Sequence, residues 1–450
     1  MAFSQKFKLT ATQVISIGFV GLILVGTLAL FLPFAAKNGF KFSFIDALFT
    51  STSAVCVTGL VVVDIGENLT LFGQIVVLLL IQLGGLGYMT ISTLIFMLFR
   101  QQISIVNRLA LKDALQKSNF ENIFSFVLFV VKSTIIIELI GSAVLAVSFI
   151  PKHGFLKGIY YSVFHAVAAF CNAGFSLYST NLLNCQRDLI VNFGIIVLII
   201  IGGIGFPVLY ELIYLKKQQR VSLQTKIVVV STIALVLIGT VLIFYAEAFN
   251  QNTDIPKDSF GLALTSLFQS VTARTAGFNT VNIGAMTTTS LVVLMGLMFI
   301  GASPSSTGGG IKTVTFTVIV YTLLNVFRGK KEVNIRDRRI PDITVMNALI
   351  IFVISILWCI FAVVFINIAD DHSLLNVVFE VISAFGTVGL SVGNPQNSAL
   401  SFCSLLSEFS KIVIILTMFI GRVGFMTIGF AMLTMQPSKI KYPEEQVNVG

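Results

Sequence analysis

The stretch FTSTSAVCVTGL at residues 49–60 aligns without a gap with three later stretches: FHAVAAFCNAGF at 164–175, LFQSVTARTAGF at 267–278 and FEVISAFGTVGL at 379–390. Each begins with a large apolar residue and ends with glycine followed by Leu or Phe. The four glycines, Gly59, Gly174, Gly277 and Gly389, are 115, 103 and 112 residues apart. Self-similarity at a regular spacing indicates four copies of one structural unit.

A second short sequence pattern, ending in glycine, follows each of the four stretches. It reads IQLGG at 81–85, IIIGG at 199–203, MFIG at 298–301 and MFIG at 418–421. One glycine in a membrane helix is usually a packing contact, because small residues let helices approach closely. Four aligned glycines, each downstream of an aligned Gly-Leu or Gly-Phe pair, instead support an internal repeat.

The composition places most of the chain in lipid. Of its 450 residues, 56% are hydrophobic and 11% are charged, and the mean hydropathy is +0.95. Apolar segments of about 20 residues or more can cross a hydrocarbon core of roughly 30 Å as helices. Eight segments meet this requirement: 12–34, 72–99, 123–149, 189–215, 227–249, 289–327, 343–369 and 406–435. The first lacks a small-residue cleavage site after it, so we expect it to remain as a helix.

Four shorter apolar segments lie between the paired spans, at 43–56, 159–172, 262–275 and 374–387. About 14 helical residues cover about 21 Å, too little to cross the bilayer, so these segments must re-enter the membrane. We predict an all-α integral membrane protein with four tandem helix–pore loop–helix repeats around one central pore, in a pseudo-fourfold arrangement like that of K⁺ channels. The predicted repeats are 1–115, 116–222, 223–340 with a broken second span, and 341–450 with a cytoplasmic tail.

Each short segment ends in a glycine-containing turn. Irregular backbone is tolerated at membrane depth only where it lines a watery path, and glycine can adopt the positive φ that aims carbonyls inward. Rings of carbonyls that replace a hydration shell form K⁺ filters. A simple turn after a buried helix is the alternative for any one copy, but four aligned copies favour a filter. The predicted filter residues, which would bind K⁺, are Val57, Thr58, Gly59, Asn172, Ala173, Gly174, Thr275, Ala276, Gly277, Thr387, Val388 and Gly389.

The distribution of positive charge predicts the orientation, because cytoplasmic loops carry an excess of Lys and Arg. The segments 1–11, 100–122, 216–226, 328–339 and 436–442 hold 18 Lys and Arg residues, against 6 in the loops on the other side. Both termini are therefore expected in the cytoplasm. The net charge of +9 is spread over short loops beside spans, which does not indicate a nucleic-acid partner.

Two other functional classes find little support. The chain has three histidines, no HExxH motif and no paired carboxylates, so we expect no enzyme activity. Its five cysteines show no CxxC spacing, which argues against a zinc site or disulfide framework. A broken-helix carrier for an organic substrate predicts two halves of opposite topology, whereas this chain shows four units of the same topology.

Seven motifs along the chain form a recognisable set: VTGL (57–60), NAGFS (172–176), RTAGFN (274–279), STGGGIK (306–312), RGKKE (328–332), AFGTVGL (384–390) and FIGRVG (419–424). With these motifs, nearly the whole chain resembles the Trk/Ktr/HKT superfamily of cation transporters, most closely the Ktr-type membrane subunits (KtrB). Eight spans without an additional leading pair favour the Ktr branch over the longer Trk branch. One departure is the run Gly308–Gly310, which is richer in glycine than the superfamily pattern.

This resemblance implies K⁺ uptake across the bacterial plasma membrane, often with Na⁺ as an activator or co-ion. It also implies a homodimer with one pore per subunit, embedded in membrane lipid, and a cytoplasmic RCK-type ring (KtrA-like) that carries the regulatory nucleotide. In relatives, Gly at the first filter glycine marks K⁺-selective forms and Ser marks more Na⁺-permeable ones; here it is Gly59. A Na⁺-permeable transporter of the same superfamily is the alternative, and a broken-helix secondary carrier is a more distant one.

The sixth apolar segment is too long for one crossing, because the 39 residues of 289–327 would make a helix of roughly 58 Å. Proline and three glycines disfavour helix near its middle. We therefore predict a loop at 301–310 that blocks the pore at rest, as a gate rather than a passive kink. We also predict that Arg422 holds this loop, since the loop carbonyls can accept hydrogen bonds from the five N–H donors of arginine. The predicted gating residues are Gly301, Ala302, Ser303, Pro304, Ser305, Ser306, Thr307, Gly308, Gly309, Gly310, Lys312 and Arg422.

Further polar residues lie in or beside the pore segments. We expect Arg274 to point away from the pore and brace its loop, and His165 to be a polar packing group rather than an ion ligand. Asp46 is expected to cap a short helix and Glu380 to hydrogen-bond loop amides behind the filter. The basic loops around 100–120 and 328–339 either bind the cytoplasmic partner or are simply solvated. Four acidic residues either concentrate cations at the pore mouth or are solvated: Asp64, Glu67, Asp370 and Asp371.

Overall fold

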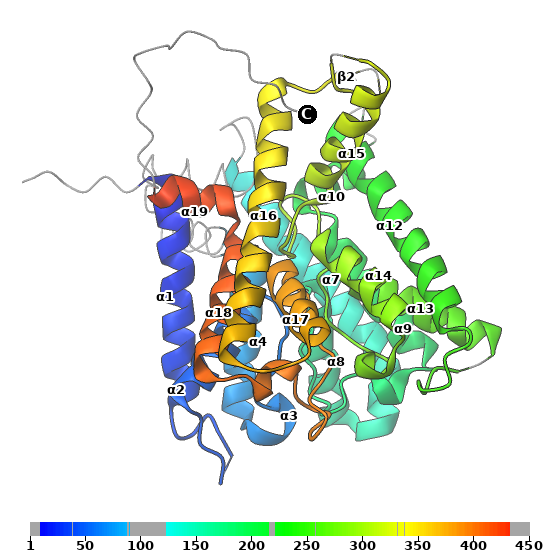
Figure 1. Ribbon diagram of the computed structural model, residues 1–450. Helices are drawn as coiled ribbons and strands as arrows, with labels where there is room; N and C mark the ends of the chain where they lie inside the picture. Colours follow the sequence, from blue (N-terminus) through cyan, green and yellow to red (C-terminus); the bar gives the residue numbers. More distant parts are fainter. Residues whose placement is uncertain are drawn as a thin grey trace, which may run out of the picture.

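The computed structural model describes residues 10–432 except 38, 88–89, 91–122, 216–220, 257, 331 and 337. Within this part the regular structure is helical, apart from a short hairpin in which β1 (Asn334–Ile335) pairs antiparallel with β2 (Arg338–Arg339). Long and short helices run side by side around a packed interior (Figure 1). The predicted all-α fold is confirmed.

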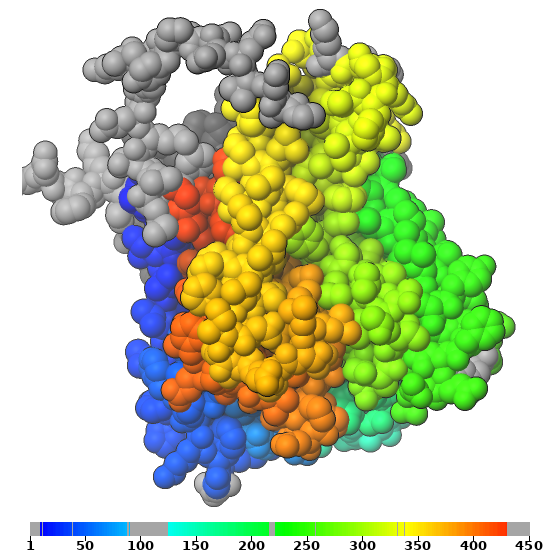
Figure 2. Space-filling model, viewed as in Figure 1, coloured from blue at the N-terminus to red at the C-terminus, as the bar shows by residue number. Residues whose placement is uncertain are grey.

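Among the residues that the structure describes, four helices are long and apolar enough to cross a membrane: α1 (Ala11–Phe31), α7 (Ile123–His153), α12 (Leu223–Glu247) and α16 (Asp342–Ala369). They carry large aliphatic side chains on their outer faces, such as Leu24, Leu237 and Leu357, each about half exposed. Figure 2 shows α16 lying on the outer surface of the molecule. Apolar side chains directed outward fit a lipid environment, so the chain is a multi-pass membrane protein.

A short helix follows each long one: α2 (Phe44–Val55), α8 (Phe155–Phe170), α13 (Ser259–Thr272) and α17 (Leu374–Gly386). The side chains of Ser43 and Asp258 accept hydrogen bonds from helix amides and so cap α2 and α13. A phenylalanine within each short helix is fully buried: Phe49, Phe164, Phe268 and Phe379. These buried rings fix the short helices inside the shell of long ones.

The second helix is shorter than predicted in three units: α4 (Leu71–Leu86), α9 (Leu189–Gly203) and α18 (Glu408–Val423). In the third unit α14 (Thr288–Phe299) ends where the break at 301–310 was predicted. After α9 the chain bends by 101° into α10 (Phe206–Ile213), and α18 is followed by α19 (Phe425–Met432), which lies crosswise at the end of α18 (Figure 1). The prediction of uninterrupted helices over 189–215 and 406–435 is therefore wrong. The predicted span 72–99 extends into residues outside the described part.

The reason is a glycine with positive φ within two residues of the end of each of these three helices. Gly87 follows α4 with φ 77°, Gly205 lies between α9 and α10 with φ 92°, and Gly424 lies between α18 and α19 with φ 88°. Glycine adopts this conformation without steric cost, and such a residue ends a helix. In the third unit α14 gives way to an irregular stretch, and helix resumes at α15 (Thr313–Phe327).

Candidate functional site

The four aligned glycines meet in the interior and form a closed ring. A Cβ atom built on Gly59 would lie 3.0 Å from the Cα of Gly174, and one on Gly174 would lie 3.0 Å from that of Gly277. The corresponding distance is 3.2 Å from Gly277 to Gly389 and 2.9 Å from Gly389 back to Gly59. We call Gly59, Gly174, Gly277 and Gly389 the glycine ring. A side chain at any of them would overlap the backbone of its neighbour, so only glycine fits.

The residue two positions before each ring glycine adopts the left-handed backbone conformation. The φ angle is 57° at Val57, 59° at Asn172, 71° at Thr275 and 49° at Thr387. This conformation costs on the order of 1–2 kcal/mol per L-residue and is a genuine outlier for β-branched side chains. Strained backbone persists where the surrounding structure imposes it, and it clusters at functional sites. The same strain in all four units therefore marks these loops as a site.

Serine side chains of the short helices hold the first and fourth loops from behind. The hydroxyl of Ser53 accepts from the Gly59 amide at 3.1 Å and donates to the Leu60 carbonyl at 2.9 Å. In the fourth unit, Ser383 accepts from the Gly389 amide at 3.1 Å. Because the glycine amides are engaged behind the ring, the carbonyls rather than the amides are free to face its centre.

His165 and Glu380 contact the second and fourth loops two residues after their ring glycines. The His165 ring is fully buried; its Nδ1 lies 2.7 Å from the Tyr161 carbonyl oxygen and its Nε2 lies 3.0 Å from the Ser176 hydroxyl. Both ring nitrogens are thus engaged within the protein, as expected of a packing group. Glu380 accepts a hydrogen bond from the hydroxyl of Ser391, two residues after its ring glycine. His165 and Glu380 therefore brace equivalent positions in two units.

On one side the ring opens into a cavity of about 410 Å³. Ring residues Gly59, Gly277 and Gly389 form part of its wall. Among the described residues, the wall includes no Asp or Glu, so the four acidic residues considered above do not line the mouth. Neutral side chains that offer oxygen or amide groups line it instead: Ser179, Thr180, Asn181, Asn279, Asn282, Ser391, Asn394, Ser398 and Ser401.

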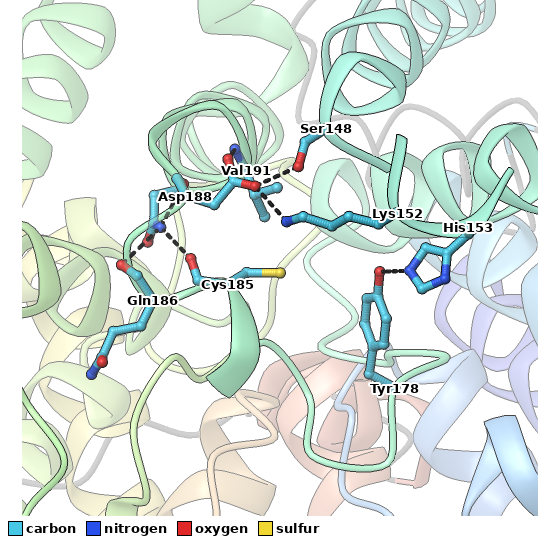
Figure 3. Close-up of polar contacts among 9 residues, drawn as sticks. Ser148, Lys152, His153, Tyr178, Cys185, Gln186, Asp188 and Val191 are labelled. Atoms are coloured by element: carbon cyan, nitrogen blue, oxygen red, sulfur yellow. Dashed lines mark hydrogen bonds and ion pairs between the residues drawn. The ribbon is translucent and has the colours of Figure 1, made fainter. Parts of the chain in front are cut away.

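In the second unit, the chain before α9 is fixed by Asp188, the N-terminal cap of that helix (Figure 3). Its carboxylate accepts from Lys152 Nζ at 2.6 Å, from the Ser148 hydroxyl, and from the Val191 amide at 3.2 Å. Burial opposes ionisation of Asp188, but these donors outweigh it and lower the pKa of the carboxyl below its usual value. The contact joins α7 to α9.

A second contact at this end joins His153 of α7 to the loop after the second ring glycine (Figure 3). The His153 ring lies 2.6 Å from the Tyr178 hydroxyl. The Tyr178 amide donates to Ser176 at 3.0 Å, the same hydroxyl that contacts His165. The conformation of the chain beyond Gly174 is therefore set by polar contacts from α7 and α8.

On the opposite side of the ring, the loop between α14 and α15 fills the space. The hydroxyl of Thr387 accepts from the Gly309 amide at 2.9 Å, and Gly308 lies directly against the side chain of Thr275. The side-chain amide of Asn172 and the hydroxyl of Thr275 are buried without hydrogen-bond partners among the described residues. Buried polar atoms of this kind point to water or an ion. The loop thus lies against the inner face of the predicted filter.

Arg422 of α18 reaches this loop across the molecule. One terminal nitrogen donates to the carbonyl of Thr307, and the other donates to the carbonyl of Gly84 and, at 3.3 Å, to that of Gly85. Its guanidinium therefore links α18, α4 and the loop. A planar group with five donors can serve several carbonyls at once, which a lysine cannot do in the same way.

Two further hydrogen bonds hold the loop, one from Lys312 just after it and one to Gly203 at the end of α9. Lys312 Nζ donates to the carbonyl of Gly308 at 2.7 Å, and the Ser303 amide donates to the carbonyl of Gly203 at 3.0 Å. Ser303 and Gly308 are buried, while Lys312 is partly buried. All of the predicted gating residues therefore lie within one connected segment or contact it.

Residues 10–441 match the TrkH family of cation transport proteins. The chain belongs to this family. Its membership agrees with the resemblance drawn from the motifs, and transport of cations, rather than catalysis, is the activity for which the family is described.

Two relatives match over almost their whole length. The Ktr system potassium uptake protein B of Bacillus subtilis is 38% identical over 98% of this chain and 97% of its own length. The potassium/sodium uptake protein NtpJ of Enterococcus hirae is 37% identical over 98% of both chains. The crystal structure of the potassium transporter TrkH from Vibrio parahaemolyticus shares the fold, with a TM-score of 0.72 and 18% identity over 96% of this chain and 87% of that one.

Sequence reasoning missed the three helix-ending glycines, Gly87, Gly205 and Gly424. A signal for them exists, since each stands three residues after the aligned glycine of its second helix. In the third unit, Pro304 stands three residues after Gly301. The G-x-x-G spacing therefore marks where each second helix breaks, and proline replaces the final glycine in the unit that carries the long loop.

The expectation for Arg274 is wrong in part. Arg274 lines a small cavity together with Ile199 and Val236. Its side chain forms no hydrogen bond with any residue that the structure describes, and its Nε is buried without a partner. It therefore does not brace the loop through hydrogen bonds.

Proposed function

We propose that this chain takes up K⁺ across the bacterial plasma membrane through one pore in which the glycine ring is the selectivity filter. The observation that carries the proposal is the closed contact of four aligned glycines, each preceded by left-handed backbone. Carbonyl oxygens arranged around such a ring can replace the hydration shell of K⁺. The names of the relatives, which mention potassium uptake, support the choice of ion.

The neutral outer cavity fits this role. Its asparagine, serine and threonine side chains can solvate a cation before it loses water, without binding it as tightly as a carboxylate would. The four short helices direct their C-terminal ends toward the ring, and the partial negative charge of those ends favours a dehydrating cation. We assign this cavity to the outside of the cell, because the Lys- and Arg-rich segments and both termini are expected in the cytoplasm.

In the proposal, the loop 301–310 is the gate and the structure corresponds to a closed state. Support comes from the contact of Gly308 and Gly309 with the inner face of the filter, and from the bonds that Arg422 and Lys312 make to the loop carbonyls. Conduction requires these residues to move aside. A cytoplasmic RCK-type ring with a bound nucleotide would supply the free energy for that movement.

We also propose a homodimer and a role for Na⁺ as activator or co-ion. The dimer follows from the resemblance to the Ktr branch, and the Na⁺ role is supported by the name of the Enterococcus relative. Cross-linking and light scattering in lipid nanodiscs test the dimer, and an active monomer would exclude it. The same relative favours a second candidate function, a transporter that carries Na⁺ as well as K⁺.

The deciding experiment is uptake by purified full-length protein in liposomes. Internal K⁺ and Na⁺ are followed while the external concentration of each is varied separately. Selective K⁺ uptake that rises when Na⁺ is added supports the proposal. Equal fluxes of both ions support the second candidate, and no cation flux with or without a cytoplasmic partner contradicts both.

A further inference from the structure

The loop 301–310 contains a backbone conformation that is unfavourable in isolation. Ser305 has φ 56°, in the left-handed region that residues with a Cβ atom seldom adopt. Backbone of this kind persists where the surrounding structure imposes it. The contacts around Ser305 therefore show which part of the molecule holds the loop in place.

Three backbone hydrogen bonds join the loop to the break between α9 and α10. The amide of Phe206, the first residue of α10, donates to the carbonyl of Ser305 at 3.1 Å. The amides of Ser303 and Thr307 donate to the carbonyls of the last two residues of α9, at 3.0 Å and 3.3 Å. The loop is thus attached to the start of α10 as well as to Arg422.

The loop and the break are also in direct contact. Gly205, between α9 and α10, has φ 92°, and a Cβ atom built on it would lie 2.4 Å from the carbonyl oxygen of Pro304. If the start of α10 moved away from the loop, the bond from Phe206 to Ser305 would break. If it moved toward the loop, it would meet the backbone of Pro304. The positions of α10 and of the loop are therefore coupled.

Glu211 holds the other end of α10. Its carboxylate accepts from the amide of Ser222, from the Ser222 hydroxyl at 2.7 Å and from the Thr225 hydroxyl. Ser222 is the N-terminal cap of α12, and a negative charge is favourable at the N-terminus of a helix. Glu211 therefore fixes the end of α10 to the beginning of α12.

We infer that Glu211 is a positioning residue for the loop 301–310 and favours its closed position. It acts through α10, because its hydrogen bonds among the described residues go to α12 and not to the loop. A helix of eight residues is about 12 Å long, so it carries a displacement of one end to the other. When Glu211 is released, α10 is free to turn, and Phe206 no longer holds Ser305 in the left-handed conformation.

This inference rests on the proposed function, in which the loop is the gate of the pore. It adds a control point away from the filter. The end of α10 at Glu211 leads into the Lys- and Arg-rich segment 216–226, which is expected in the cytoplasm. A cytoplasmic partner that draws this end of α10 away from α12 would loosen the loop without contacting it.

The direct test is hydrogen–deuterium exchange of the full-length protein in lipid nanodiscs, followed by mass spectrometry of peptides that cover 301–310. We expect Glu211→Ala to speed exchange of the loop amides by about tenfold, the ratio that corresponds to the loss of one charge-assisted hydrogen bond. Glu211→Gln keeps one acceptor oxygen and should restore part of the protection.

Asp370→Ala is the matched control. Asp370, at the end of α16, also accepts from the amide and hydroxyl of a helix-capping serine, Ser407, at 3.1 Å and 3.0 Å. Its removal should leave exchange in 301–310 unchanged. If the loop exchanges at the wild-type rate in Glu211→Ala, or if Asp370→Ala speeds it equally, Glu211 does not position the loop.

Flux into liposomes separates this inference from the proposed function. Glu211→Ala should raise K⁺ flux in the absence of a partner, and Asp370→Ala should not. If deleting 303–309 raises flux while Glu211→Ala changes neither loop exchange nor flux, the gate stands and the role of Glu211 is excluded. If Glu211→Ala speeds loop exchange while the deletion leaves flux unchanged, Glu211 positions the loop but the loop is not the gate.

Discussion

Lys411 and Asp46 are 365 residues apart in the sequence, yet the Lys411 amine lies 2.9 Å from the Asp46 carboxylate. The pair joins α18 of the last unit to α2 of the first. A backbone contact reinforces it, because the Ser401 amide donates to the Val61 carbonyl at 2.8 Å. Asp46 also accepts from Ser43, the residue whose side chain caps α2. These contacts help the first and last units to meet and close the ring.

We predict that Lys411→Met lowers the free energy of unfolding by about 1–3 kcal/mol, between the values for exposed and fully buried pairs. The intermediate value follows from the exposure of the two side chains, 15% and 23%. The measurement is denaturation in detergent. Arg187→Gln is the control, because its pair with Asp258 is 75% and 54% exposed and should contribute little. Equal effects of the two variants would show that ring closure does not depend on the buried pair.

We predict that Gly59→Ser lowers the discrimination of K⁺ over Na⁺. Gly59 has φ 93°, and a Cβ atom there would overlap the carbonyl oxygen of Ala173. The overlap displaces the carbonyl of Ala173, which belongs to the predicted filter, and a loss of about 1.4 kcal/mol in the preference of that carbonyl for K⁺ would lower the discrimination about tenfold. The measurement is the ratio of K⁺ to Na⁺ flux in liposomes.

Gly154→Ser is the matched control for this prediction. Gly154 also has positive φ, at 79°, but a Cβ atom there meets nothing within 4 Å. The control should therefore carry the conformational cost without the clash at the ring. If both variants keep the wild-type flux ratio, the glycine ring is not the filter.

We predict that loosening the loop increases K⁺ flux and weakens its dependence on a cytoplasmic partner. Deleting residues 303–309 should have the largest effect. Arg422→Ala removes charge-assisted hydrogen bonds worth about 1.5–3 kcal/mol, which would shift the closed-to-open ratio by roughly tenfold or more. Thr387→Val should act in the same direction but less strongly, because it removes the acceptor of a single bond from Gly309.

Liposome flux with and without the partner measures this effect, and protein recovered in the membrane fraction controls for folding. Arg422→Lys is a useful comparison, since it keeps the charge but cannot reach several carbonyls with a planar group. A well-folded deletion variant that conducts no faster than the parent and remains equally regulated would show that the loop is a passive break.

We predict that Asp188→Asn destabilises the protein at neutral pH by about 1 kcal/mol or less, because Lys152 is partly exposed. Asparagine retains the capping oxygen, so the variant isolates the effect of the charge. The folded-state pKa of Asp188 is lowered, so the carboxylate stabilises the fold above its ordinary pKa of about 3.9. This contribution is lost as the pH falls through the lowered value. Melting curves at several pH values check it; a difference that does not change with pH would contradict it.

The sequence determined the all-α membrane fold, the four short helices and the residues of the predicted filter. It could do so because each property depends on local pattern: apolar length sets what can cross the bilayer, and the spacing of Gly59, Gly174, Gly277 and Gly389 reports a repeated unit. The interruption after α14 was predictable for the same reason, since Pro304 and three glycines disfavour helix wherever they stand.

The tertiary structure decided which groups meet. The breaks at Gly205 and Gly424 depend on positive φ, which a single glycine permits but does not require, so continuous helices were expected there. The left-handed backbone of Val57 is unfavourable in isolation and persists because the surrounding structure holds the loop, including Ser53 behind it and the neighbouring loop at Gly174. The contacts of Arg422 with Thr307 and Gly84 likewise depend on the packing of distant helices. The local conformational preference of a segment depends on residues that are neighbours in the sequence. The pairing of charges and the strain of the loops depend on contacts between segments far apart in the chain.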